Sequence, residues 1–221
     1  TGGAGFIGSH FIRILLAEEA DAQVVNLHVL TYAGNLSNLA DVASSPRYRF
    51  VRGDIRDMKV AQELAADADW IVNFAAESHV DRSTKARAGE FIDTNVYGAY
   101  VMLEATRQVN RGARFLQVGT DEVYGDVPFP EFPNEQAMLA PSSPYSAAKA
   151  GADHIALAFH RTHQMDVIVS RCTNNYGPNQ YPEKVIPVFV TNALDGEPLP
   201  LYDGGTQVRD WLRVGDHRRA L

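Results

Sequence analysis

The sequence predicts an α/β fold in which a doubly wound parallel sheet carries helices on both faces. Three observations predict it. A glycine-rich turn at the start of the chain runs directly into apolar residues at helical spacing. Short apolar runs then alternate with longer helical segments. Polar residues gather where several apolar runs end, which is the edge at which open parallel sheets bind ligands.

The first element is a glycine turn formed by Gly2, Gly5 and Gly8, with Phe11 opening the apolar helical pattern. Such a turn at a helix N-terminus offers backbone N–H groups and a positive dipole end to a pyrophosphate. A glycine triplet alone fits an ordinary turn as well. Because this one heads an alternating pattern, it favours dinucleotide binding and a Rossmann-type sheet. The chain starts inside the motif, so we expect a fragment whose first strand, before Thr1, is missing.

The remaining elements follow in the order that this fold requires. We expect strands at Val24–Leu30, Tyr48–Val51, Trp70–Phe74, Arg114–Val118 and Asp166–Arg171, and helices at Asp57–Ala66, Phe91–Asn110, Tyr145–Gln164 and between Pro182 and Gly196. Leu199–Tyr202 and Val208–Arg213 look like two further strands. Residues 1–172 then form the Rossmann domain, and residues 173–221 begin a smaller C-terminal substrate-binding region.

Two short motifs carry the chemistry. Tyr145 and Lys149 lie four residues apart, so on a helix they share one face. An ammonium beside a phenol lowers the phenol's pKa, which makes Tyr145 a candidate base near neutral pH. Asp121 and Glu122 suit acid–base work. Adjacent strand residues point opposite ways, so both acids serve one site only if the backbone is irregular from Gly119 onward. A chance helix-surface pair and a solvated turn are the alternatives.

Other polar groups have two interpretations each. Asp54 is placed to accept a hydrogen bond from an adenine amino group, or to cap the helix that follows, a role that Asp57 fills at least as well. For His79 and Asp81 we prefer a local hydrogen-bonded loop. Asn95, within a predicted helix, is expected to bracket backbone groups.

Two polar groups near the C-terminal part suit a sugar nucleotide. Asn174 and Asn175 stand in a turn rich in amide groups, which suit sugar hydroxyls. Arg209 is placed to pair with a diphosphate, although an exposed arginine explains it too.

Composition excludes several classes of protein. The net charge of −7 argues against a nucleic acid or an anionic membrane as partner. No apolar run approaches the roughly 20 residues of a membrane span, and there is no signal-peptide pattern. The single cysteine, Cys172, fits a reducing compartment, so we expect a cytoplasmic protein in which this thiol is a small buried hydrophobe. The sequence shows no cluster of metal ligands.

These motifs together resemble the extended short-chain dehydrogenase/reductase superfamily, which the glycine turn and the Tyr-x-x-x-Lys pair mark. Within it, the chain resembles the dTDP-glucose 4,6-dehydratase family. The more specific likeness lies in Leu30–Asn35, Thr120–Gly125 and Asn174–Pro178. Further matching pieces are Thr1–Ser9, Ala75–Ser83, Tyr145–Lys149, Pro182–Pro187 and Arg209–Leu212.

The resemblance implies a hydro-lyase that uses NAD without consuming it. Tyr145 takes the proton of the sugar's 4-hydroxyl while a hydride passes from C4 to NAD, Thr120 bonds that oxygen, and Lys149 holds the nicotinamide ribose. Glu122 then removes the C5 proton, Asp121 protonates the 6-hydroxyl, and water leaves. The hydride returns to C6, which gives a 4-keto-6-deoxy nucleotide sugar.

The resemblance also implies the ligand contacts. Those to NAD are Gly2, Gly5, Phe6, Ile7, Gly8, His28, Thr31, Asp54, Ile55, Phe74, Ala75, Ala76, Ser78, Thr94, Tyr145, Lys149 and Asn175. Those to the nucleotide sugar, dTDP-glucose by this likeness, are Ser78, Thr120, Asp121, Glu122, Asn174, Lys184, Val185, Tyr202 and Arg209. It further implies a homodimer built through the two longest predicted helices.

Two residues depart from the family's pattern. A Rossmann unit places an acid about 20 residues past the glycines, where it bonds the ribose hydroxyls. The family has Asp there, and this chain has His28, which leaves the preference for NAD over NADP open. Gly119 stands where the family has Ser, which removes no catalytic group.

Two other functions stay open. An epimerase or decarboxylase of the same superfamily needs the tyrosine and the cofactor but not the acid pair. A non-catalytic nucleotide-binding protein on the same scaffold is favoured by His28 and opposed by the complete set of Thr120, Tyr145 and Lys149.

Overall fold

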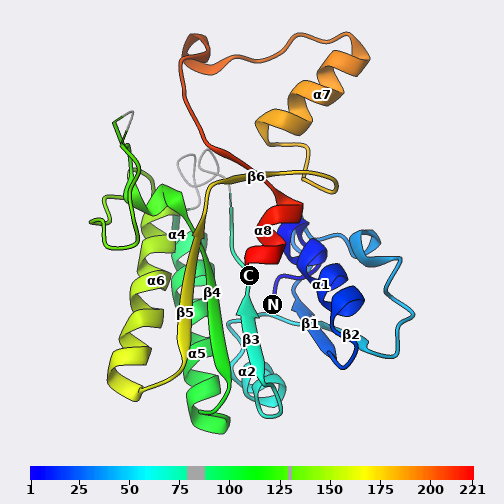
Figure 1. Ribbon diagram of the computed structural model, residues 1–221, viewed down its shortest axis with the longest axis vertical. Coiled ribbons are helices and arrows are strands. Elements are labelled where there is room, and N and C mark those ends of the chain that lie inside the picture. The colour runs from blue at the N-terminus through cyan, green and yellow to red at the C-terminus, as the bar shows by residue number, and fades with distance from the viewer. Residues whose placement is uncertain (79–87, 129–130) are drawn as a thin grey trace.

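Helices and parallel strands alternate along most of the chain, as the sequence predicts (Figure 1). The computed structural model describes residues 1–78, 88–128 and 131–221, without the side chains of Tyr202 and Asp203. His79 and Asp81 therefore lie outside the described residues. The strands are β1 (Val24–His28), β2 (Tyr48–Arg52), β3 (Trp70–Asn73), β4 (Arg114–Thr120), β5 (Val167–Cys172), β6 (Asn174–Tyr176) and β7 (Trp211–Arg213).

The helices differ widely in length. They are α1 (Phe6–Glu18), α2 (Met58–Ala65), α4 (Ala88–Phe91), α5 (Gly98–Val109), α6 (Pro144–His163), α7 (Val185–Asp195) and α8 (Val214–Ala220). Shorter turns are η1 (Leu36–Leu39), the π-helical η2 (Ile92–Tyr97), η3 (Asp121–Tyr124) and η4 (Tyr202–Gly205). No helix among these described segments is both long and apolar enough to cross a membrane.

The strands form parallel groups that the first residues of the chain connect. β1 pairs with β2, and β3, β4 and β5 pair in that order. Gly2 N donates to Leu27 O on β1 at 2.9 Å, and Thr1 N donates to Val72 O on β3 at 2.7 Å. The chain start thus lies between β1 and β3 (Figure 1), which is the switch point of a doubly wound sheet.

The main core lies between this sheet and α2, α5 and α6. Phe115 and Leu103 are fully buried there, and Leu27, Ile71 and Met165 are nearly so. Burying side chains of this size stabilises a fold by about 1.5–3 kcal/mol each. The core therefore holds β3 and β4 firmly under the strand ends that carry the candidate site.

Local signals explain where the helices begin. Asp57 caps α2 by accepting hydrogen bonds from the backbone of Lys59 and Val60, so the capping interpretation of Asp57 is confirmed. Ser143 caps α6 in a reciprocal pair with Ser146, and Pro144 occupies the first turn. This cap places Tyr145 at the very start of α6.

The long predicted helix at Phe91–Asn110 is α4, η2 and α5 in direct succession. A π-helical turn inserts where Asn95 turns inward and is only 2% exposed. Its Oδ1 accepts from Glu77 N at 2.8 Å, and its Nδ2 donates to Glu77 O at 3.0 Å. The expectation that Asn95 brackets backbone groups is confirmed.

Four sequence-based expectations are wrong in whole or in part. β4 continues through Gly119 and Thr120, which pair with β5, so the irregular backbone starts only at Asp121. Leu199–Tyr202 forms no strand among the described residues, and only the last three residues of Val208–Arg213 do, as β7. The predicted turn at Asn174 is instead β6, which pairs parallel with β7. Distant pairing, which local pattern does not encode, decided these segments.

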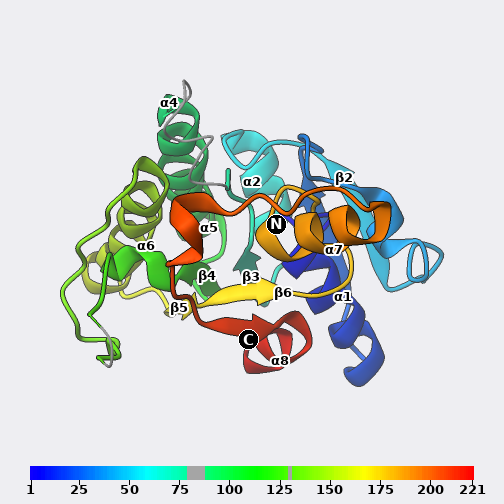
Figure 2. The same cartoon turned by 90° about the horizontal axis from the view of Figure 1, so that it is seen from above.

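The last part of the chain leaves the sheet and returns to it. Figures 1 and 2 show α7 beyond the strand ends and α8 beside α1. α7 ends next to Gly196, as predicted. Gly196 adopts the left-handed conformation there, and α7 has no buried residue. In contrast, α8 buries Val214 and His217. His217 Nδ1 lies 3.0 Å from Asn175 Oδ1, which ties α8 to β6.

Candidate active site

One cleft opens where the strands β1 to β5 end. Every residue that the resemblance assigns to NAD lines it, from the glycine turn to Asn175. From the sugar-nucleotide set it is lined by Ser78, Thr120, Glu122, Asn174, Lys184 and Val185. Asp121 and Arg209 line an adjoining hollow, which shares Glu122, Thr173 and Asn174 with the cleft. The side chain of Tyr202 lies outside the described residues.

The glycine turn fits tightly against the end of β3. Gly2 has a φ of 70°, and a Cβ on it would lie 2.5 Å from Ala75 N. A Cβ on Gly8 would lie 2.7 Å from Gly2 O. No side chain caps α1, whose first residues face the cleft. Free N–H groups and the helix dipole at this point suit the pyrophosphate of a dinucleotide.

The lining of the cleft includes an ion pair. Arg56 Nη2 lies 2.6 Å from Asp54 Oδ2, and this partner lowers the pKa of Asp54. Both residues line the cleft. The carboxylate of Asp54 is therefore ionised, and its negative charge is balanced by Arg56.

Tyr145 and Lys149 lie on the face of α6 that lines the cleft. Lys149 is buried, and its Nζ donates to Val118 O at 2.6 Å. Burial raises the pKa of Tyr145 well above its usual value, and Glu122 and Asp121 raise it further, while Ser78 acts in the opposite direction. The expectation that Lys149 lowers this pKa is wrong here, because burial and the nearby acids set the direction of the shift.

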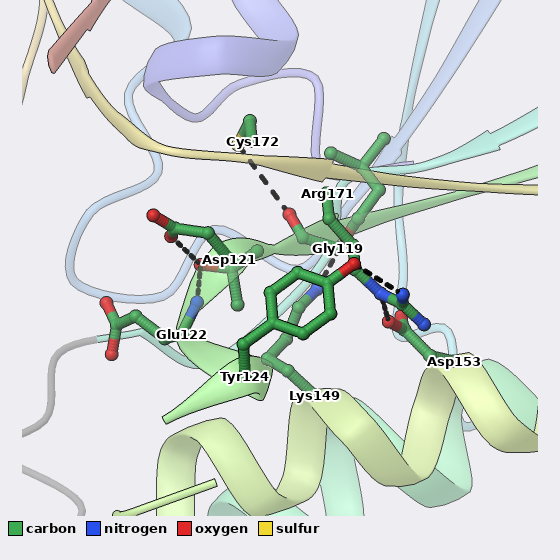
Figure 3. A network of polar contacts seen from close by, with 10 residues as sticks. Gly119, Asp121, Glu122, Tyr124, Lys149, Asp153, Arg171 and Cys172 are labelled. Carbon is green, nitrogen blue, oxygen red and sulfur yellow. Dashed lines mark hydrogen bonds and ion pairs between the residues drawn. The ribbon is translucent and has the colours of Figure 1, made fainter. Parts of the chain in front are cut away.

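The two acids extend from η3 on the same side of the backbone (Figure 3). Thr120 Oγ1 donates to Asp121 Oδ1 at 3.3 Å and accepts from Glu122 N at 3.3 Å. Burial is the main cause that raises the pKa of both carboxyl groups. Lys184 and Arg209 partly offset this effect at Glu122. The pair therefore holds protons to higher pH than exposed acids do.

A buried polar network lies behind β4, and the sequence reasoning missed it. Arg171 Nε lies 2.8 Å from Asp153 Oδ2, and Arg171 Nη1 donates to Tyr124 Oη at 2.8 Å (Figure 3). The sequence signal that could have found this network is spacing. Asp153 follows Lys149 by one helical turn, so both lie on the same face of the predicted helix. The network also explains Gly119, where a Cβ would lie 2.5 Å from Ser170 O and 3.1 Å from Asp153 Oδ1.

Cys172 and Tyr32 also line the cleft. Cys172 is only partly buried and lines the cleft, and burial raises its pKa to about 11, so it stays a thiol. Tyr32 was not predicted as a site residue. Its hydroxyl donates to Glu183 at 2.9 Å, which connects the loop after β1 with the segment before α7. The described residues contain no cluster of three or more potential metal ligands.

The fold and the site together define a dinucleotide-binding protein of the short-chain dehydrogenase type, with an acid pair beside its Tyr–Lys motif. The chain belongs to the family whose model is described as GDP-mannose 4,6 dehydratase, which matches residues 1–221.

Close relatives carry related names. The chain is 52% identical to a dTDP-glucose 4,6-dehydratase of Streptomyces niveus over 225 residues, covering 100% of this chain and 66% of that protein. It is 52% identical to the structure of DesIV, a dTDP-glucose 4,6-dehydratase of Streptomyces venezuelae with NAD and TYD bound, with a TM-score of 0.94 and coverage of 99% and 68%. A UDP-glucuronic acid 4-epimerase of Bacillus cereus is 26% identical, with a TM-score of 0.91 and coverage of 99% and 69%.

Proposed function

We propose that the protein converts dTDP-glucose to dTDP-4-keto-6-deoxyglucose. The observation that carries this proposal is the acid pair at the end of β4, where Glu122 lines the same cleft as Tyr145 and Lys149, and Asp121 lines the adjoining hollow. Identity of about one half to relatives named for this reaction supports it. The chain spans 66% of the length of the S. niveus relative, so the proposal concerns the whole protein.

We propose NAD as the resident cofactor. When bound, it accepts a hydride from the sugar and later returns it. The glycine turn and the uncapped start of α1 would hold its pyrophosphate. Lys149 would bond the nicotinamide ribose, and Asn95 would support this arrangement by fixing the backbone of Glu77 beside Ala76 and Ser78.

The first proton transfer falls to Tyr145, whose Oη takes the proton of the 4-hydroxyl once the phenol is ionised. The structure holds this phenol protonated, so ionisation needs help. The positive end of the α6 dipole lies at Tyr145, and the Lys149 ammonium lies one turn further on. Thr120 would hold the same sugar oxygen and so keep it in line with Tyr145.

The elimination falls to the acid pair. Glu122 takes the proton from C5, and Asp121 gives a proton to the departing 6-hydroxyl, which leaves as water. Glu122 gives its proton back to C5 when the hydride returns to C6. The raised pKa of Asp121 suits an acid, because the group keeps its proton until the leaving oxygen needs it. The raised pKa of Glu122 makes it a stronger base once ionised. Each proton transfer of this type typically contributes about 10²–10⁴-fold.

Cations at the mouth of the site favour an anionic substrate. Lys184 Nζ lies 3.5 Å from Ser78 Oγ, on the cleft side of α7. Arg209 lines the adjoining hollow with Asp121. We propose that both contact the nucleotide diphosphate of the sugar.

The test is incubation of the full protein with dTDP-glucose and NAD, followed by mass analysis of the nucleotide sugar. Loss of one water, with no net change in the amount of NAD, is expected. A product of unchanged mass with inverted C4 would instead establish the epimerase alternative. Unchanged substrate and no bound dinucleotide would support the non-catalytic alternative.

We also propose a homodimer, a division into residues 1–172 and 173–221, and a cytoplasmic location. Exposed apolar residues on η2, α5 and α6 support the homodimer. The separate β6–β7 sheet supports the division into two regions, although α8 packs on α1. The free thiol of Cys172 supports the cytoplasmic location.

A further inference from the structure

The last residue of β1 is a histidine around which the following turn is built. His28 Nδ1 accepts a hydrogen bond from Leu30 N at 2.8 Å. Leu30 has a φ of 61°, in the left-handed region. Gly34 lies so near the ring that a Cβ on it would be 2.6 Å from His28 Cε1. These contacts fix the orientation of the imidazole at the edge of the cleft.

The hydrogen bond from Leu30 also decides which ring nitrogen carries the proton. A neutral imidazole that accepts at Nδ1 carries its proton on Nε2. Burial lowers the pKa of His28 to about 4, so the ring is neutral at pH 7. His28 therefore offers one N–H donor and no charge.

This is the opposite of what dinucleotide folds usually present at this place. An acid about 20 residues past the glycine turn accepts a hydrogen bond from the ribose 2′-hydroxyl. Its negative charge also disfavours a 2′-phosphate. His28 has no such charge, and the carboxylate of Asp54 in the same cleft is balanced by Arg56, 2.6 Å away.

We propose that His28 sets a relaxed cofactor specificity, in which the site binds NADP as well as NAD. The Nε2–H group donates to an oxygen at the ribose 2′ position, whether that oxygen belongs to a hydroxyl or to a phosphate. This inference rests on the proposed function only in that the cleft holds a nicotinamide dinucleotide.

The test is a titration of the nucleotide-free full protein with NADH and, separately, with NADPH. The fluorescence of the reduced nicotinamide reports binding and gives a Kd for each dinucleotide. The two Kd values should lie within about tenfold of each other. The His28→Asp variant should raise the Kd for NADPH relative to NADH by at least about tenfold, because it adds a charge that repels the phosphate. The variant keeps the turn, since an Asp oxygen accepts from the N–H two residues on.

His28→Asn is the matched control. It keeps the same turn contact and an N–H donor but adds no charge, so its ratio of Kd values should stay near that of the native protein. A native protein that binds NADH more than about tenfold more tightly than NADPH would overturn the proposal. An equal shift in the Asp and Asn variants would also overturn it. If His28→Asp fails to fold, the native ratio decides by itself.

The titration is independent of the dehydration assay. If both dinucleotides bind as expected but dTDP-glucose is unchanged, the proposed function fails and the specificity inference stands. If water is lost but NADPH does not bind, the specificity inference fails alone.

Discussion

At the end of β4, burial acts on two carboxyl groups at once. Asp121 and Glu122 both have raised pKa values, and Thr120 contacts the carboxyl of one and the backbone N–H of the other. A third buried group, Tyr145, responds in the same direction. Three neighbouring groups that resist ionisation suit a site in which protons pass between protein and sugar rather than to water.

Removing the proton-carrying ability of the pair should separate the two halves of the reaction. In the variant that combines Asp121→Asn and Glu122→Gln, loss of water should fall by about 10²–10⁴-fold, because elimination has no acid or base. Oxidation at C4 should continue, so reduced nicotinamide should accumulate and be visible by absorbance. Glu63→Gln, an exposed carboxyl on α2 that lines neither the cleft nor the adjoining hollow, is the control. If oxidation falls as much as elimination, the pair positions the sugar instead.

His28 predicts an acid sensitivity of the fold. Burial is the main cause that lowers its pKa from the ordinary 6.5 of an imidazole to about 4 in the structure. The unfolded chain binds more protons between these values, so the contribution to stability is complete above pH 6.5 and falls as the pH drops towards 4.

His28→Asn should remove this part of the acid sensitivity. Between neutral pH and the acid end of that window, the variant should lose less free energy of unfolding than the native protein. The expected difference is on the order of 1 kcal/mol, a value discounted because the ring is partly exposed. Urea unfolding of both proteins, at neutral pH and at the acid end of that window, measures this difference in the free energy of unfolding. Equal losses in the two proteins would contradict the assigned burial effect.

At the scale of elements, the helix formed by α4, η2 and α5 shows how an insertion serves the site. The π-helical turn lets Asn95 face the backbone of Glu77 while α5 keeps its buried face on the core. The bracket holds the strand-end segment of Ala75, Ala76 and Ser78 where it lines the cleft. One amide thus connects a helix with the cofactor-facing loop.

Asn95→Ala should therefore affect both stability and binding. The partly buried backbone N–H and C=O of Glu77 lose their partner, at a cost of about 2–4 kcal/mol in the free energy of unfolding. Affinity for NADH should fall as well, because the segment beside the cleft is no longer fixed. Asn192→Ala, an exposed amide bonded to Pro198 O, is the control and should change stability by less than about 0.5 kcal/mol. A destabilised variant with unchanged affinity would show that the bracket is structural only.

At the scale of the whole molecule, the face formed by η2, α5 and α6 is apolar although it is exposed. Ile92 is 48% exposed, Tyr97 51%, Tyr100 37% and Leu157 38%. The Tyr97 and Tyr100 rings lie 5.9 Å apart, and Tyr100 reaches Phe159 on α6 at 6.2 Å. Exposed apolar side chains gathered in this way are typical of an interface between subunits.

The proposed homodimer should depend on that surface. Sedimentation of the full protein should give twice the monomer mass, and Tyr97→Glu should shift it towards the monomer, because a buried charge is left without a partner. Met138→Glu, in the loop before α6 and 84% exposed, should leave the mass unchanged. A native monomer would refute the dimer, and dissociation by both variants would indicate an unspecific effect.

The sequence by itself determined the α/β class, the glycine turn, the Tyr–Lys pair and the place of the acids after β4. Each depends on short-range signals such as spacing, capping and strand-end position. All the residues that the resemblance assigns to NAD line one cleft. Their individual roles are proposals.

Only the tertiary structure decided the properties that arise from distant neighbours. The pairing of β6 with β7, the Arg171–Asp153 pair behind the site and the direction of the Tyr145 pKa shift all depend on residues far apart in the chain. Burial sets the dielectric environment and the hydrogen-bond partners of a group, and neither can be read from local pattern. The same is true of His28, whose proton position follows from one backbone contact made after folding.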